Sequence, residues 1–268
     1  MQMSLAASIF LSIMLFSLPG CGDRSGQKTG DQAMHLPEAD SILLARYPDS
    51  VGLRLEVSAA SEAGGDVRRA LQWVDEGLQR DSLQPVLWNR KASLLLSMQD
   101  TTGAIGSLLR SLSVDPSQTD ILLELGFIYA DRRDPAALSV AERILSPAGD
   151  PRFQAQAQYL KGIYFGNIGR FAEAIRAYDG AIGSSYTFTD AYIEKGILLY
   201  EQKRVTEALS VFEKVLTVNN ALADAYYWRG RCLETGGDKT AALDDYRRAL
   251  SLDPDIRGAR EGEKRLSK

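Results

Sequence analysis

The chain has 268 residues, of which 45% are hydrophobic and 25% are charged, a composition typical of a folded protein rather than a disordered one. Its net charge of -4 provides no overall basic field to attract a phosphate backbone, so no nucleic-acid partner is expected. One histidine and two cysteines exclude a zinc cluster of Cys and His ligands and a disulfide framework within the folded body.

The N-terminal residues have the pattern of an export signal. An uncharged apolar run of fifteen residues covers Ser4 to Leu18, which is too short for a membrane span but typical of a signal-peptide core. The run is followed by an LPGC motif ending at Cys21, which resembles the lipobox of bacterial lipoproteins. The resemblance implies a signal peptide over residues 1–20 and a lipid on Cys21. Because Gly22 resembles outer-membrane sorting signals, the expected address is the bacterial cell envelope, at the outer membrane facing the periplasm. An uncleaved signal anchor and an ordinary cleaved signal are the alternatives.

Residues 21–50 are predicted to be a flexible spacer that ends in a short capping segment. Gly, Asp, Gln, Lys and Ser dominate up to about Pro37, and such a composition offers little to bury. The only histidine, His35, lies in this spacer, far in sequence from any plausible nucleophile, and is interpreted as solvated. The apolar cluster at 42–44 predicts a short helix that covers the first repeat.

The remaining sequence repeats itself with a period of 34 residues. Gly162, Gly196 and Gly230 are separated by 34 residues, and an alanine follows each of them twelve residues later. Extending this frame gives six repeats, of which only the third departs from the period, with 36 residues. The predicted repeats are 51–84, 85–118, 119–154, 155–188, 189–222 and 223–256. Residues 257–268 are predicted to form a C-terminal capping helix.

Two positions of the repeat always carry small residues. Position 8 carries Ser58, Ala92, Gly126, Gly162, Gly196 and Gly230, and position 20 carries Ala70, Ala104, Ala137, Ala174, Ala208 and Ala242. This pattern, with an aromatic residue at position 24 and proline at 32 in the last repeat, resembles the tetratricopeptide repeat (TPR) family. The resemblance implies an all-α fold, a right-handed superhelical solenoid of about six helical hairpins, each with a helix A and a helix B.

Residues at the turns agree with these hairpins. Aspartates stand at position 16, where their carboxylates can cap helix B, and glycines at position 15 fit a left-handed turn. The predicted caps are Asp66, Asp100, Asp134 and Asp238, and the predicted turn glycines are Gly65, Gly169 and Gly237. Asp-Pro pairs at 115–116 and 253–254 predict the end of helix B.

The resemblance also implies where a partner would bind. In similar proteins the A helices line a concave groove that holds an extended or helical peptide. The corresponding side chains of repeats three to six are Phe127, Tyr159, Ile163, Ile193, Ile197, Tyr200 and Tyr227. Charged residues are expected at the border, namely Asp120, Asp190, Asp224, Arg231 and Glu234. This pattern favours apolar binding with little dependence on salt, although any one of these side chains could instead be used in packing between repeats.

Several sharper interpretations are excluded or weakened by the same frame. Chaperone-binding repeats resemble one another in a carboxylate clamp with asparagine at position 9, and no repeat here has asparagine there. Lys161, Lys195 and Arg229 precede the glycine of position 8 and are interpreted as structural. Cys232 is interpreted as a buried apolar group rather than a reactive thiol. No metal site is predicted.

No arrangement of nucleophile, base or paired carboxylates stands outside the repeat frame, so the protein is predicted not to be an enzyme and to need no cofactor. The expected function is a membrane-anchored protein-protein interaction scaffold for envelope assembly or for cell-wall or pilus-type complexes. It would bind a peptide or helix of a partner protein, with no small-molecule substrate evident. The alternatives are a non-catalytic obligate subunit or adaptor of an envelope enzyme and a purely structural spacer.

Overall fold

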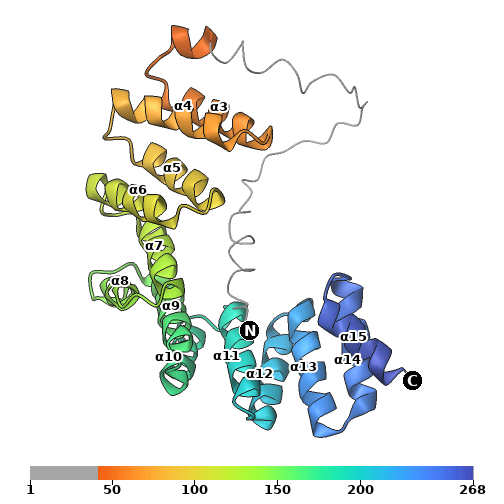
Figure 1. Cartoon of the computed structure of the whole chain (residues 1–268). Helices are drawn as coiled ribbons and strands as arrows, with labels where there is room; N and C mark the ends of the chain where they lie inside the picture. Colours follow the sequence, from red (N-terminus) through yellow and green to blue (C-terminus); the bar gives the residue numbers. More distant parts are fainter. Residues whose placement is uncertain (1–41, 268) are drawn as a thin grey trace, which may run out of the picture. The chain divides into compact units, whose positions relative to one another are not determined.

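The computed structural model describes residues 42–267, and every regular element within them is a helix (Figure 1). This confirms the predicted all-α solenoid of helical hairpins. The chain divides after Pro116 into two compact parts, and each is described by itself. The signal, spacer and lipid-anchor predictions for Cys21 and its neighbours lie outside the described residues, as does His35.

The N-terminal part, residues 42–116, contains two hairpins preceded by a short helix at 42–46. Its four longer helices are α3 (Val51–Ala63), α4 (Val67–Arg80), α5 (Pro85–Ser97) and α6 (Thr101–Val114). In the short helix, Leu44 is buried while Ile42 and Leu43 are exposed, so only one side chain of the predicted apolar cluster covers the first hairpin. The core of this part joins Val74 and Leu78 of α4 to Leu87 of α5.

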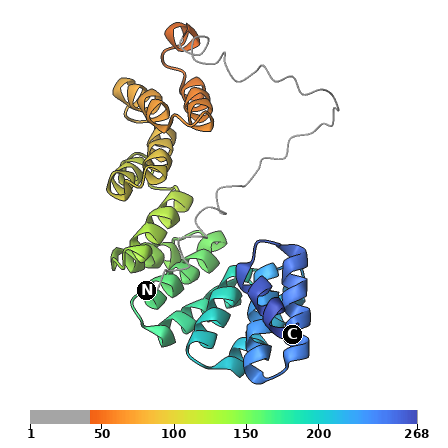
Figure 2. The same cartoon turned by 45° about the vertical axis from the view of Figure 1, so that its right-hand side comes forward.

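The C-terminal part, residues 117–267, contains four hairpins and a last helix (Figure 2). Its α-helices are α7 (Thr119–Asp131), α8 (Ala136–Leu145), α9 (Gln154–Asn167), α10 (Phe171–Ser184), α11 (Thr189–Glu201), α12 (Val205–Val218), α13 (Ala223–Gly236), α14 (Lys239–Leu252) and α15 (Arg257–Leu266). The A helices are α7, α9, α11 and α13, and the B helices are α8, α10, α12 and α14. Outside the third hairpin, position 16 of the repeat is the N-cap of helix B, which begins at position 17.

Small residues allow the two helices of each hairpin to lie close together. Ala208 of α12 is 0% exposed, and so are the other alanines at position 20. A Cβ atom added to Gly196 of α11 would overlap the ring of Phe212 on α12, which is itself fully buried. The contact between helices A and B is therefore filled to native density, and a side chain at Gly196 would have no room.

The turn between helices A and B uses a left-handed residue in all six repeats. Gly65, Gly169 and Gly237 have positive φ angles, as predicted, and Gln99, Arg133 and Lys203 occupy the equivalent positions with φ between 57° and 63°. Three of the four predicted aspartate caps are confirmed, since Asp66, Asp100 and Asp238 each accept a hydrogen bond from the amide three residues later.

The third hairpin departs from the others. The predicted cap Asp134 is wrong in detail, because α8 begins at Ala136 with Pro135 as its N-cap, and the Asp134 carboxylate accepts from the Ala136 amide. Helix α8 has only 10 residues, and the chain then continues through a 3₁₀ turn, η1 (Pro151–Phe153), into α9. The longer connection between α8 and α9, which includes η1, accounts for the irregular length of this repeat.

Helix α15 covers the open end of the last hairpin. Ala259 and Gly262 are its buried residues, and a Cβ atom added to Gly262 would overlap the ring of Tyr246 on α14. Arg265 of the same helix forms a two-pronged ion pair with Glu234 of α13, with both distances 2.7 Å. The last hairpin thus packs its apolar face against α15 instead of leaving it to solvent.

Candidate functional site

The A helices lie on the inner side of the C-terminal part. Two of the three pairs of neighbouring A helices contact one another, namely α7 with α9 and α11 with α13. Among the described helices no pair of neighbouring B helices makes contact to the same extent. Because the A helices are closer together than the B helices, the stack curves toward the A side. The seven predicted partner-binding residues all belong to this side.

Tyr159, the predicted anchor on α9, belongs to the core rather than to an open surface. Its side chain is only 6% exposed and contacts the rings of Phe127, Tyr178 and Phe188 at centroid distances of 6.0, 5.8 and 5.2 Å. Phe127 and Ile163 are half-buried and pack against the same cluster. Repeats three and four therefore use their predicted apolar side chains mainly to hold neighbouring helices together.

Ile193 and Ile197 of α11 have the same role. Both are half-buried and pack against the buried side chains of α12, among them Phe212. Packing between helices thus consumes most of the apolar surface that the repeat pattern predicts for the groove. What remains open to solvent on the A side is largely polar.

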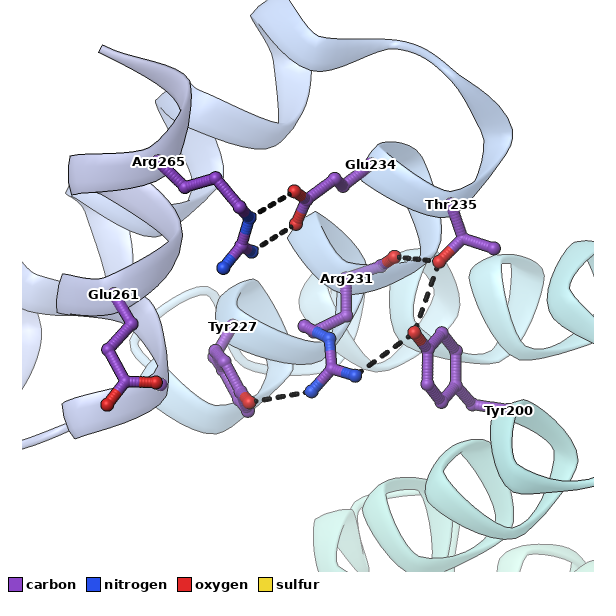
Figure 3. Close-up of a pocket in the computed structure, with 8 residues that line it drawn as sticks. Tyr200, Tyr227, Arg231, Glu234, Thr235, Glu261 and Arg265 are labelled. Atoms are coloured by element: carbon purple, nitrogen blue, oxygen red, sulfur yellow. Dashed lines mark hydrogen bonds and ion pairs between the residues drawn. The ribbon is translucent and has the colours of Figure 1, made fainter. Parts of the chain in front are cut away.

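Tyr200 and Tyr227, the last two predicted residues, line a pocket of about 520 Å³ between α11, α13 and α15 (Figure 3). Arg231 lies between them. Its Nη1 donates to the Tyr227 hydroxyl at 2.9 Å and its Nη2 to the Tyr200 hydroxyl at 3.2 Å. Its guanidinium also lies over the rings of Tyr200, Tyr227 and Trp228, at 5.1, 5.8 and 5.5 Å from their centroids. Aromatic faces therefore surround a cation that makes no ion pair within the described residues.

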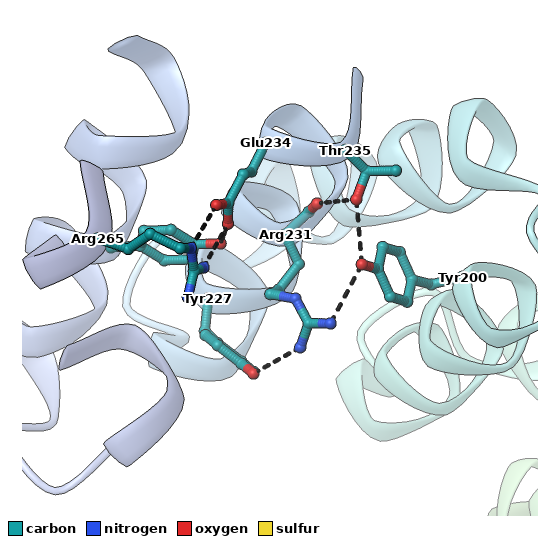
Figure 4. Close-up of polar contacts among 7 residues, drawn as sticks. Tyr200, Tyr227, Arg231, Glu234, Thr235 and Arg265 are labelled. Carbon is teal, nitrogen blue, oxygen red and sulfur yellow. Dashed lines mark hydrogen bonds and ion pairs between the residues drawn. The ribbon is translucent and has the colours of Figure 1, made fainter. Parts of the chain in front are cut away.

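The opposite wall of the pocket is held by Glu234 and Arg265 (Figure 4). Glu234 accepts both bonds from Arg265 and a third from the Tyr246 hydroxyl at 2.6 Å. The bond from Arg265 is the main reason why the pKa of Glu234 lies below its usual value. Glu234 is thus fully engaged in attaching α15, whereas Arg231 keeps N–H donors free for a ligand.

Sequence analysis missed part of this pocket. Arg231 and Glu234 were predicted at the border of the groove, but Arg265 and Glu261 come from α15, outside the repeat frame. No local pattern connects Glu234 to Arg265, which lies 31 residues later. The sequence indicates this ion pair only through the basic residues in the last turn of the expected capping helix. They favour a carboxylate partner but do not identify which one.

The basic residues before the position-8 glycines have the predicted structural role in two cases. Lys195 forms an ion pair with Asp179 of α10 at 2.6 Å, and Arg229 binds Asp245 of α14 through two bonds of 2.7 Å. Cys232 is 1% exposed, and burial raises the pKa of its thiol to about 12, which confirms it as an unreactive buried group.

Residues 42–267 have neither a metal-binding cluster nor a membrane-spanning helix. No group of three or more His, Cys, Asp or Glu side chains there is arranged to hold a metal ion. None of the helices described has the length and hydropathy needed to cross a bilayer. The pocket and the A-helix side around it are therefore the features on which a function can be argued.

Comparisons with known proteins agree with this geometry. Models of the tetratricopeptide repeat match residues 159–222 and 223–256. A tetratricopeptide repeat protein from Parabacteroides merdae is 19% identical, with a TM-score of 0.63 over 86% of this chain and 91% of that one. PilW, described as a widely conserved type IV pilus biogenesis factor, is 18% identical, with a TM-score of 0.61 over 84% and 98%.

A repeat protein from Cytophaga hutchinsonii is 15% identical, with a TM-score of 0.58 over 84% of this chain and 92% of that one. No curated protein sequence matches the chain significantly. At these identities the solved structures establish the fold alone. Residues 159–256 are therefore tetratricopeptide repeats, and the earlier hairpins have the same fold.

Proposed function

We propose that the protein is a lipid-anchored scaffold of the bacterial envelope, which holds a peptide or helix of a partner protein against the A-helix side of residues 117–267. Tetratricopeptide repeats are generally non-catalytic modules that bind protein or peptide partners. The observation that carries the proposal is the pocket at Tyr200, Tyr227 and Arg231, which opens on that side. Aromatic side chains and arginine are the residue types that contribute most to binding energy at interfaces.

The membrane anchor rests on the LPGC motif at Cys21 and on the polar spacer that follows it. A lipid on Cys21 would attach the chain to a membrane, and the spacer would let the repeats reach a partner away from the bilayer. Assembly of envelope complexes, of which pilus biogenesis by PilW is one example on the same fold, is the setting that we propose.

The anchor is tested by Cys21→Ser in the full chain expressed in a bacterial host. We expect the variant either to remain an unprocessed precursor or to appear as soluble periplasmic protein, because the spacer has no other apolar segment. Fractionation followed by immunoblotting measures this. If the variant remains in the membrane fraction after normal cleavage, the lipid anchor at Cys21 is refuted.

The binding side is tested by placing a photo-crosslinking amino acid at single positions of the full chain. At Tyr200, inside the pocket, we expect a specific crosslink to one partner protein in cells, identified by mass spectrometry. The matched control is Phe171 on α10, a B helix, which is similarly aromatic and 38% exposed. Crosslinking of the same partner from Phe171 but not from Tyr200 would place the binding side on the B helices.

A further inference from the structure

The A helices of residues 117–267 carry an excess of acidic side chains that the repeat pattern does not require. They are Asp120, Glu124 and Asp131 on α7, Asp190, Glu194 and Glu201 on α11, and Asp224 on α13. Asp190 and Asp224 occupy position 2 of consecutive repeats, so they recur on the same side of the stack. None of the seven forms an ion pair within the described residues.

The basic side chains of the same helices are directed elsewhere. Helix α7 has none, and α9 has only Lys161. Lys195 and Arg229 are paired with aspartates of B helices, and Arg231 is enclosed by tyrosines at the C-terminal end of the face. The seven acids named above are therefore left without an ion-pair partner among the described residues.

The surroundings of these carboxyl groups make their charge unfavourable when the face is empty. Desolvation, followed by the charges of Asp190, Glu201 and Asp224, raises the pKa of Glu194 to about 7. Desolvation also raises the pKa of Asp131 to about 6. Such shifts arise when ionised carboxylates lie close together in a concave surface without a counter-charge. A cation placed among them would remove this cost.

The hydroxyl of Tyr159 is a further polar group that no side chain of the described residues engages. Tyr159 is 6% exposed, yet its hydroxyl makes no hydrogen bond within the part of the chain that is described. Burial, and then the charges of Glu194, Asp190 and Asp131, raise the pKa of Tyr159. The hydroxyl therefore lies within electrostatic reach of carboxylates from α7 and α11. Because this oxygen is not among the fully buried polar atoms without a partner, it reaches solvent and can accept from a donor outside the chain.

We propose that the acidic A-helix face formed by α7, α11 and α13, with the Tyr159 hydroxyl at its floor, receives a lysine- or arginine-bearing segment of the partner protein. The inference rests on the proposed function and specifies the chemistry of that partner. A single metal ion does not fit, because no three carboxylates among the described residues are close enough to share one. A row of cationic side chains on a peptide matches acids spread over successive repeats. Binding should therefore depend on salt, unlike the apolar contact expected from the sequence.

The test uses the full chain and short dye-labelled peptides in which alanine alternates with lysine, with serine or with glutamate. We expect the lysine peptide alone to bind by fluorescence anisotropy, with an affinity that falls steeply between low and high salt. The double variant Asp190→Asn with Glu194→Gln should bind it about tenfold more weakly. Because the substitutions remove partly desolvated charges without changing shape, the variant should remain folded. Asp224→Asn on α13, at an exposed position of the same face, provides a second test.

The matched control is Glu142→Gln with Asp244→Asn, which removes the same two charges from exposed positions on the B helices α8 and α14. If this control weakens binding as much as the groove variant does, the lysine peptide responds only to net charge, and the inference is wrong. If the serine or glutamate peptide binds as tightly as the lysine peptide, the scaffold function survives but the assignment of a cationic partner fails. If no peptide binds, the inference falls, and the crosslinks from Tyr200 still decide the proposed function.

Discussion

At the scale of single residues, the same repeat pattern places side chains in different environments. Tyr159 and Tyr200 both lie on A helices and both fit the pattern of a groove, but Tyr159 is enclosed by three rings while Tyr200 reaches solvent through the pocket. The difference arises because Phe127, Tyr178 and Phe188 happen to surround the first tyrosine. A position in a repeat therefore predicts the side of the helix, but the neighbouring repeats decide whether the side chain is exposed.

The small residues give the clearest stability prediction. Gly196→Ala should lower the free energy of unfolding by about 1–3 kcal/mol, because the new methyl group overlaps the buried Phe212 ring. Gly183→Ala on α10 is the matched control, since nothing lies within 4 Å of its Cβ position, and its effect should stay within about 0.5 kcal/mol. Urea unfolding followed by circular dichroism measures both. An unchanged midpoint for Gly196→Ala would contradict the tight contact between α11 and α12.

At the scale of helices, the turn between helices A and B is more uniform than its sequence. All six turns place one residue in the left-handed region, but only three of these residues are glycine. At Gln99, Arg133 and Lys203 a side chain adopts this conformation at a cost of about 1–2 kcal/mol each. The packing of the two helices imposes the turn, so it forms even where the local sequence does not favour it.

The capping helix illustrates the same point for a whole element. The sequence of α15 is polar and rich in charge, and only Ala259 and Gly262 are buried. Its attachment depends on the close approach of Gly262 to Tyr246 and on the pairing of Arg265 with Glu234. Attaching α15 also completes the pocket, because Gly258, Glu261 and Arg265 form one of its walls. The cap is therefore part of the candidate site as well as of the fold.

At the scale of the whole molecule, charge is distributed unevenly between the two sides of the stack. In the C-terminal part, ion pairs such as Lys195 with Asp179 join A helices to B helices, while seven of the eight acids on the A helices have no such partner among the described residues. The net charge of -4 does not reveal this separation, because it adds the charges that form ion pairs to those that do not. The local field of the A side, rather than the net charge, would select a partner.

This separation predicts how stability depends on pH. The folded chain holds the proton of Glu194 up to a pKa of about 7, above the ordinary value of 4.5, so between about pH 5 and pH 7 it binds more protons than the unfolded chain. Raising the pH through this range should therefore favour unfolding. Glu194→Gln removes the titrating group and should flatten this decline, as measured by urea midpoints at several pH values. The control is Glu142→Gln at an exposed position, which should leave the decline in stability unchanged. If Glu194→Gln also leaves the decline unchanged, Glu194 is not its source.

The fold could be read from the sequence because its determinants are local and repeated. Small residues at positions 8 and 20, aspartates before helix B and Asp-Pro pairs after it recur at a period of 34 residues, and each acts on helices adjacent in the chain. The exception was Asp134, where the proline that follows it moves the start of α8. Hairpins of this kind need little information from distant parts of the chain.

The candidate site could not be read in the same way, because it depends on contacts between repeats. Tertiary packing buries Tyr159 and places Ile193 and Ile197 against the core. It also brings Arg265 to Glu234, which lies 31 residues earlier in the chain. It further decided that Lys195 and Arg229 pair with aspartates of the B helices, while most acids of the A helices have no ion-pair partner among the described residues. A repeat pattern specifies which side of a helix a residue occupies, but charge pairing and exposure depend on which side chains the neighbouring helices bring to that side.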